Sequence, residues 1–190
     1  MEKNFSNKSN NSKELETDID KVLNNMYPKN QQVKVRDYTP EILLINNVRN
    51  LPMLITQRHI KSIIYSFKEA KKLKLTTKNI NYHGLGKKLF LKVINDLDNP
   101  KAVYKKDDNN YIIISKYKDL NNREIIIPVQ INAIGRYKEG FVNENQIKSI
   151  YGRNNLYNYI ENNKLELVYK KEELDFNEGI QYSNVANSST

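Results

Sequence analysis

The stretch AVYKKDDNNYIIISKYKDLNNREIIIPVQIN, residues 102–132, decides the fold class of this sequence. It contains three runs rich in β-branched and aromatic residues: Ala102–Lys105, Tyr111–Tyr117 and Glu124–Asn132. Polar, turn-like segments at 107–110 and 118–123 separate them. Such runs with short polar connections predict consecutive antiparallel strands. Pro128 lies inside the third run, and because proline has no N–H for a sheet ladder, we expect an edge position or a bulge there.

The residues after this stretch extend the predicted sheet. Asn145–Tyr151 alternates in a way that favours a fourth strand, and Leu165–Tyr169 is a candidate for the last one. Between them, residues 152–163 predict a turn followed by a short helix, because Leu156, Tyr159 and Ile160 lie at helical spacing.

The residues before this stretch have helical periodicity. His83 and Gly84 open a helix in which Leu85, Leu89, Val93 and Leu97 recur every four residues. Thr56 is the predicted N-cap of a helix that continues to Leu75, with an apolar stripe and a basic opposite side. Thr39, with its hydroxyl group as the cap, starts a short helix that ends near Asn46. The sequence therefore predicts an α+β fold, with N-terminal helices followed by a four- to five-stranded antiparallel sheet.

The length of 190 residues fits one domain with tails. Residues 1–12 are polar and rich in Asn and Ser, so we expect a disordered arm. Residues 13–32 are predicted to form an amphipathic helix and a linker; this helix either packs on the core or binds a partner. Residues 33–174 form the predicted domain, and a polar tail covers 175–190.

The formal net charge is +9, and the chain is rich in Lys, Asn, Ile and Tyr. An AT-rich genome explains that composition as well as a polyanionic partner does, so the charge alone does not assign nucleic acid binding. The chain has no Cys, which excludes disulfides and thiolate sites. It has no signal segment and no apolar run long enough to span a bilayer, so we expect a cytoplasmic protein of the host or target cell, without membrane contact.

Few residues can carry acid–base chemistry near neutral pH, because the chain has only two histidines, His59 and His83. His59 lies beside an apolar helical stripe, whereas His83 lies at a helix start, where we expect an exposed ring and anion-binding N–H groups. The sequence has no His-x-x-x-His pair, phosphate-binding glycine loop or nucleophile elbow. We therefore expect neither a metal nor another cofactor. The remaining side chains suffice for metal-independent RNA cleavage, in which the 2′-hydroxyl of the substrate is the nucleophile.

The segment 148–153 (KSIYGR) is the richest candidate site. In a strand, Ser149 and Tyr151 project to the same face, and Lys148 and Arg153 flank them with positive charge. An ordinary amphipathic strand with a solvated polar face explains the same pattern, so both interpretations stay open at this point.

Several short blocks occur in one order along the chain: Thr39-Pro40-Glu41, Leu51-Pro52 with Ile55-Thr56, His83-Gly84-Leu85, Asn99-Pro100, Asn145-x-Ile147-x-Ser149-Ile150-Tyr151 and Leu167-x-Tyr169-x-Lys171. Together they resemble the phage MuF C-terminal domain, a family of the barnase, EndoU, colicin E5/D and RelE-like nuclease superfamily. The resemblance implies helices followed by an antiparallel sheet, and a ribonuclease toxin or effector that binds RNA and has an immunity or antitoxin protein as a partner.

The resemblance implies most strongly that His83, Ser149 and Tyr151 belong to the site. It implies the same, less strongly, for Thr56, His59 and Lys171. With it, we expect His83 to be the general base or acid, with Tyr151 or His59 as its partner. Ser149 is expected to position the substrate, and the phosphate-binding candidates are Lys148, Arg153, Lys171, Thr56 and Arg58. The alternative is a catalytically inactive nuclease-like fold that binds nucleic acid or a protein, as a phage accessory protein. Because an arm and one helix precede the domain in place of a large capsid-associated portion, we expect a free-standing product or an excised domain.

Overall fold

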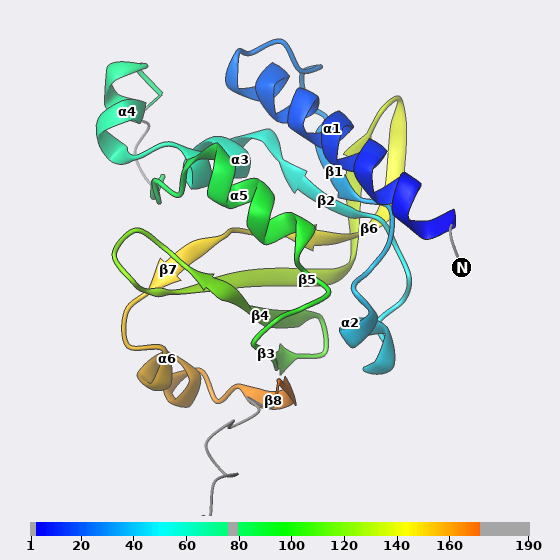
Figure 1. Ribbon diagram of the computed structural model, residues 1–190, viewed down its shortest axis with the longest axis vertical. Coiled ribbons are helices and arrows are strands. Elements are labelled where there is room, and N and C mark those ends of the chain that lie inside the picture. Colours follow the sequence, from blue (N-terminus) through cyan, green and yellow to red (C-terminus); the bar gives the residue numbers. More distant parts are fainter. Residues whose placement is uncertain (1–2, 76–79, 172–190) are drawn as a thin grey trace, which may run out of the picture.

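The computed structural model describes residues 3–75 and 80–171 as one mixed α+β fold (Figure 1). The helices are α1 (Lys3–Leu23), α2 (Glu41–Ile45), α3 (Gln57–Ile64), α4 (Phe67–Lys72), α5 (Gly86–Asn95) and α6 (Leu156–Asn162). The strands are β1 (Gln32–Arg36), β2 (Met53–Thr56), β3 (Ala102–Asp107), β4 (Asn110–Lys118), β5 (Glu124–Tyr137), β6 (Gly140–Ile147), β7 (Tyr151–Arg153) and β8 (Glu166–Lys170). They form one sheet in the order β1-β2-β6-β5-β4-β3-β8, and β7 pairs with β5.

The three predicted central strands are present as an antiparallel meander. Ile113 of β4 lies opposite Val103 of β3 on one side and Ile127 of β5 on the other. The long β5 then pairs with β6 through Val129 and Ile147. Short polar connections and β-branched runs are therefore sufficient to predict this part of the fold.

Within the described residues the sheet is larger than predicted, with eight strands rather than four or five, and it is not fully antiparallel. One additional strand arises because the predicted fourth strand is divided into β6 and β7. The other two are β1 and β2, which pair with each other, and β2 joins the rest through a parallel pairing of Met53–Ile55 with Asn145–Ile147 of β6. The sequence shows only a short alternation at 32–36 and an extended segment at 51–55. Their pairing partner lies far along the chain, so no local pattern indicates it.

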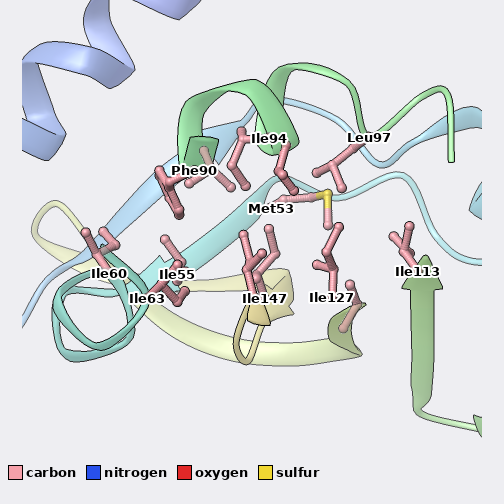
Figure 2. Close-up of a cluster of buried hydrophobic side chains, with 14 of the residues drawn as sticks. Met53, Ile55, Ile60, Ile63, Phe90, Ile94, Leu97, Ile113, Ile127 and Ile147 are labelled. Carbon is pink, nitrogen blue, oxygen red and sulfur yellow. The ribbon is translucent and has the colours of Figure 1, made fainter. Parts of the chain in front are cut away.

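Two apolar layers cover the two faces of the sheet. The larger core combines α1, α3 and α5 with one face of the strands (Figure 1). Figure 2 shows part of it, where Phe90 and Ile94 of α5 lie above Met53, Ile127 and Ile147 of the sheet. The smaller cluster lies under α6, on the opposite face. Neighbouring residues of β4 and β5 alternate between the two clusters, as the pleat of a strand requires.

The helices differ from the sequence prediction in three places. The predicted helix from Thr56 to Leu75 is two helices, because Ser66 and Glu69 form a capping box that starts α4. Residues 1–12 were expected to be disordered, whereas α1 begins at Lys3. The buried Leu15 and Ile19 anchor the helix, and once a helix is nucleated each further residue adds one hydrogen bond.

The third difference concerns Thr39, whose hydroxyl group does not cap α2. Thr39 is fully buried. Its hydroxyl group donates to the carbonyl oxygens of Arg49 and Leu51. The same oxygen accepts from the N–H of Leu51 and from the side-chain amide of Asn145. Thr39 therefore ties the loop after α2 to β6.

The predicted fourth strand is interrupted between β6 and β7. Residues 148–150 leave the ladder opposite Ile127 and Pro128, since Ile147 pairs with Val129 and Tyr151 pairs with Ile126. Lys148 donates its N–H to the carbonyl oxygen of Pro128 (2.9 Å), but proline has no N–H to return. The bulge expected at Pro128 is therefore present, and the extra residue lies on the facing strand.

Candidate functional site

His83 is held in place through the end of α3. The N–H groups of His83, Gly84 and Leu85 donate to the carbonyl oxygens of Ser62, Tyr65 and Ile63 at 2.8, 3.0 and 2.9 Å. These carbonyls have no partner within the helix, so the segment satisfies them. Gly84 has a φ of +66°, and a Cβ atom there would lie 3.2 Å from the Cβ atom of Ser66. Glycine at position 84 therefore allows His83 to lie against the α3–α4 junction.

The side chains of His83, Ser149 and Tyr151 meet at this point. The Nε2 atom of His83 lies 3.3 Å from the Oγ atom of Ser149. The imidazole ring stacks on the ring of Tyr151, with centroids 5.0 Å apart and planes inclined by 20°. The three residues that carried most weight in the sequence therefore form one cluster. Ser149 reaches it from the bulge between β6 and β7, not from the predicted continuous strand.

Both histidines favour the neutral form near neutral pH. Burial lowers the pKa of His83, and the positive charge of Arg123 and the nearby His59 lower it further. Burial also lowers the pKa of His59, with smaller contributions from Lys148 and Arg58. The prediction that the His83 ring is exposed at a helix start is wrong, because α5 begins only at Gly86 and the imidazole is half-buried. A neutral imidazole beside a hydroxyl group can accept a proton.

Tyr151 stays protonated at neutral pH. Burial raises its pKa, Tyr159 of α6 raises it further, and Arg153 opposes the shift. The guanidinium group of Arg153 lies over the ring of Tyr159, 4.5 Å from its centroid. Tyr151 is therefore a proton donor in the cluster, and Arg153 is held near it by the same tyrosine.

Lys148 links the cluster to a buried carboxylate. Its Nζ atom donates to Gln146 (2.7 Å) and Gln130 (3.3 Å). Both carboxylate oxygens of Glu144 are buried and have no hydrogen-bond partner in the described part of the chain. Burial raises the pKa of Glu144, and the nearby Gln32, Lys148 and Gln146 oppose the shift without removing it. Lys148 is thus a charged group that acts on both Glu144 and His59.

Sequence reasoning missed Arg123 and Asp119. In the turn between β4 and β5, the Nε atom of Arg123 donates to the Oδ2 atom of Asp119 (2.6 Å), and Asp119 is almost fully buried. A Cβ atom at Gly152 would clash with the Asp119 carboxylate and lie 3.0 Å from Arg123 Nε. A single glycine inside a strand pattern indicates such a close approach, so Gly152 was the available indication.

Three other predicted site residues have different positions. Thr56 caps α3, because its Oγ1 atom accepts from the N–H of His59 (3.2 Å). Arg58 is exposed on the first turn of α3, beside His59. Lys171 follows β8 at the opposite edge of the sheet, four strands from β7 by way of β5, β4 and β3. At about 4.8 Å per strand this separation is roughly 19 Å, so the fold does not bring Lys171 to His83.

A comparison with protein families bears on this cluster. The model of the phage MuF C-terminal domain matches residues 74–175, which is more than half of the chain. The chain belongs to the phage MuF C-terminal domain family. No curated protein and no solved structure matches the chain. The earlier blocks, from Thr39 to Thr56, lie outside the matched range.

The MuF C-terminal domain match contains His83, Arg123, Ser149 and Tyr151, whereas His59 precedes it. It also contains α5 and the strands from β3 to β8, but not β1 and β2. In residues 3–75 and 80–171, no three or more His, Asp or Glu side chains gather in a way that could hold a metal ion. None of the helices in those ranges has the length and hydrophobicity to cross a membrane.

Proposed function

We propose that this MuF C-terminal domain is a metal-independent endoribonuclease of phage or polymorphic-toxin type, related to the barnase, EndoU, colicin E5/D and RelE-like nucleases. The observation that supports the proposal is the cluster in which a neutral imidazole, a hydroxyl group and a protonated phenol lie together. Cationic side chains lie near it: Arg153 acts on Tyr151, and Lys148 and Arg58 act on the nearby His59.

In the proposed reaction, His83 accepts the proton of the ribose 2′-hydroxyl group. The 2′-oxygen attacks the adjacent phosphorus atom, the bond from phosphorus to the 5′-oxygen breaks, and Tyr151 or His59 protonates the leaving oxygen. The products are a 2′,3′-cyclic phosphate and a free 5′-hydroxyl group. Ser149, at 3.3 Å from His83, positions the substrate, and Lys148 and Arg153 stabilise the negative charge on the phosphate oxygens.

Of the two candidate partners, Tyr151 is in direct contact with His83, whereas His59 acts on it only through its charge. Because the pKa of His59 is lowered, most of it is neutral at pH 7 and a poor acid. We therefore assign the general acid to Tyr151 and keep His59 as the alternative.

The experiment uses the full chain and a short RNA in excess EDTA, with the same sequence in DNA as the matched control. The expected result is cleavage of RNA only, with a 2′,3′-cyclic phosphate on the product. A substrate with a single 2′-deoxy nucleotide must resist cleavage at that position. Cleavage of DNA, or products without a cyclic phosphate, contradict the mechanism.

The second candidate is an inactive nuclease-like fold that binds nucleic acid or a protein. The buried carboxylate of Glu144, which lies near Lys148, is a feature that a binding protein can carry as easily as an enzyme. RNA binding without cleavage at any pH between 5 and 9 supports this candidate. Toxicity on expression that a linked immunity or antitoxin protein relieves supports the nuclease.

A further inference from the structure

Arg123 has the arrangement of an anion-binding residue that neither the sequence patterns nor the proposed mechanism uses. Its Nε and Nη2 atoms both contact one oxygen, Oδ2, of Asp119. The other carboxylate oxygen accepts the N–H groups of Asn121 and Arg123 at 2.9 Å each. The carboxylate is thereby fully used, and its pKa is lowered because these hydrogen bonds outweigh the effect of burial. The pair is fixed at two points on a tight turn.

The rest of the guanidinium group is free to bind a ligand. The Nη1 atom has no hydrogen-bond partner among the described residues, and 29% of the side-chain surface of Arg123 is exposed to solvent. A guanidinium group presents five N–H donors in a rigid plane, and those that do not contact Asp119 remain available. Since a buried carboxylate fixes the orientation of the side chain, little side-chain entropy is lost when an anion binds.

The packing of β7 places this group against the residue that follows Tyr151. Gly152 leaves space for the Asp119–Arg123 pair against β7, with the position of its missing Cβ atom 3.0 Å from Arg123 Nε. The preceding residue, Tyr151, stacks on His83. In the ladder, Gly152 lies opposite Ile125 and Arg153 opposite Glu124, directly after Arg123. Arg123 is also the charged side chain with the largest effect on His83.

We infer that Arg123 and His83 together form a site for a phosphate group, with Asp119 as the positioning residue of Arg123. The ligand class is a tetrahedral oxyanion, a phosphate monoester or diester, which a guanidinium group binds through two parallel hydrogen bonds. The proposed function supplies only the identity of the natural ligand, the phosphodiester of RNA. Binding of the anion itself does not depend on RNA cleavage.

The test follows the C2 proton of His83 by NMR during titration with inorganic phosphate at constant ionic strength. The chain has two histidines, so the spectrum of His59→Gln assigns the signal. In the unmodified protein, phosphate is expected to shift the signal to saturation and to raise the pKa of His83, because the anion offsets the charge of Arg123. Arg123→Gln is expected to weaken phosphate binding by about 10- to 100-fold, the effect of losing charge-assisted hydrogen bonds.

Three variants make the test specific. Arg123→Lys keeps the charge without the planar fork, so its affinity for phosphate is expected to lie between those of the unmodified protein and Arg123→Gln. Asp119→Asn, which keeps the shape of the carboxylate, is expected to weaken binding because Arg123 loses its anchor. Arg136→Gln removes an exposed arginine from the far half of β5 and is the matched control, with unchanged binding.

The inference is overturned if phosphate leaves the His83 signal unchanged, or if folded Arg123→Gln binds phosphate as tightly as the unmodified protein. RNA cleavage is measured on the same samples. Phosphate binding without cleavage retains the anion site and rejects the nuclease. Cleavage that Arg123→Gln leaves unaffected retains the nuclease and rejects the role of Arg123.

Discussion

Replacing His83 with alanine separates a catalytic from a structural role, because the structure gives a magnitude for each. The variant loses a ring stack of about 0.5–1.5 kcal/mol and one side-chain hydrogen bond of about 0.5–1.5 kcal/mol. The backbone hydrogen bond to Ser62 remains. We therefore expect the free energy of unfolding to fall by about 1–3 kcal/mol.

Such a loss leaves the protein folded. From a typical stability of about 5–15 kcal/mol, even the largest loss keeps the folded fraction above about 95%. Loss of one acid–base group lowers turnover by about 10²–10⁴-fold, which corresponds to about 2.7–5.5 kcal/mol in the activation barrier. Unfolding cannot account for a change of that size, so the two roles give different results.

The assay measures urea unfolding and RNA turnover on one preparation of His83→Ala, with His59→Ala as the parallel variant. The expected result is a folded protein with turnover reduced by at least 100-fold and RNA affinity nearly unchanged, because the phosphate contacts come from Lys and Arg side chains. A folded His83→Ala protein with near-normal turnover refutes the assignment, and a matching loss in His59→Ala transfers the role to His59.

The pH profile adds a second check on His83. The imidazole must be neutral to accept a proton, so the rate falls as the pH drops through its pKa. Since burial, Arg123 and His59 lower that pKa from 6.5, the acidic limb of the unmodified protein is expected below pH 6.5. An acidic limb above pH 7 in kcat/KM, which reports the free enzyme, contradicts this arrangement.

Three further predictions concern stability and RNA binding. Glu144→Gln is expected to raise the free energy of unfolding by about 1 kcal/mol at pH 8 and not at pH 4, measured by urea unfolding. The raised pKa of Glu144 means that the folded state favours the protonated carboxyl group. The contribution of this group to the free energy of unfolding is therefore present at low pH and lost as the pH rises, whereas glutamine stays neutral at both pH values. Gly84→Ala is expected to destabilise the fold by about 1–3 kcal/mol in thermal unfolding, because φ is +66° and Ser66 occupies the space of a methyl group. Lys68, Lys71 and Lys72 are exposed on α4, and we expect their replacement with glutamine to weaken the salt dependence of RNA binding. The slope of log affinity against log salt, measured by fluorescence anisotropy with single-stranded RNA, is expected to fall by up to about 2. An unchanged slope means that the RNA binds elsewhere.

Local patterns in the sequence predict the elements whose partners are close in the chain. The meander from β3 to β5 has β-branched runs and polar turns, and α5 has its four-residue repeat, so both are predicted. By contrast, β1 is a run of only five residues that alternate between polar and apolar, and β2 pairs in parallel with β6 across more than half of the domain. Pairing of that kind depends on tertiary packing, which no window of the sequence contains.

The residues of the candidate site also differ in how well the sequence predicts them. His83, Ser149 and Tyr151 are chemically conspicuous and lie in recognisable blocks, so they are predicted and the fold brings them into contact. Lys171 is equally conspicuous but lies at the opposite edge of the sheet. Arg123 and Asp119 belong to a turn that resembles any polar connection, and only their close approach to Gly152 and the effect of Arg123 on the pKa of His83 place them near the site. Residue chemistry therefore selects candidates, and topology decides which of them can act together.

Pro128 connects the fold to the chemistry of the site. A strand that continued from β6 through residue 151 would place Ser149 and Tyr151 two residues apart on one face, with their side chains parallel. In the structure the two side chains contact one imidazole in different ways, Ser149 at its Nε2 atom and Tyr151 at its ring face. Because Pro128 returns no hydrogen bond to Lys148, residues 148–150 bulge out, and Ser149 approaches the edge of His83 while Tyr151 stacks on it. The proline that weakens the sheet therefore lies opposite the bulge from which Ser149 reaches His83.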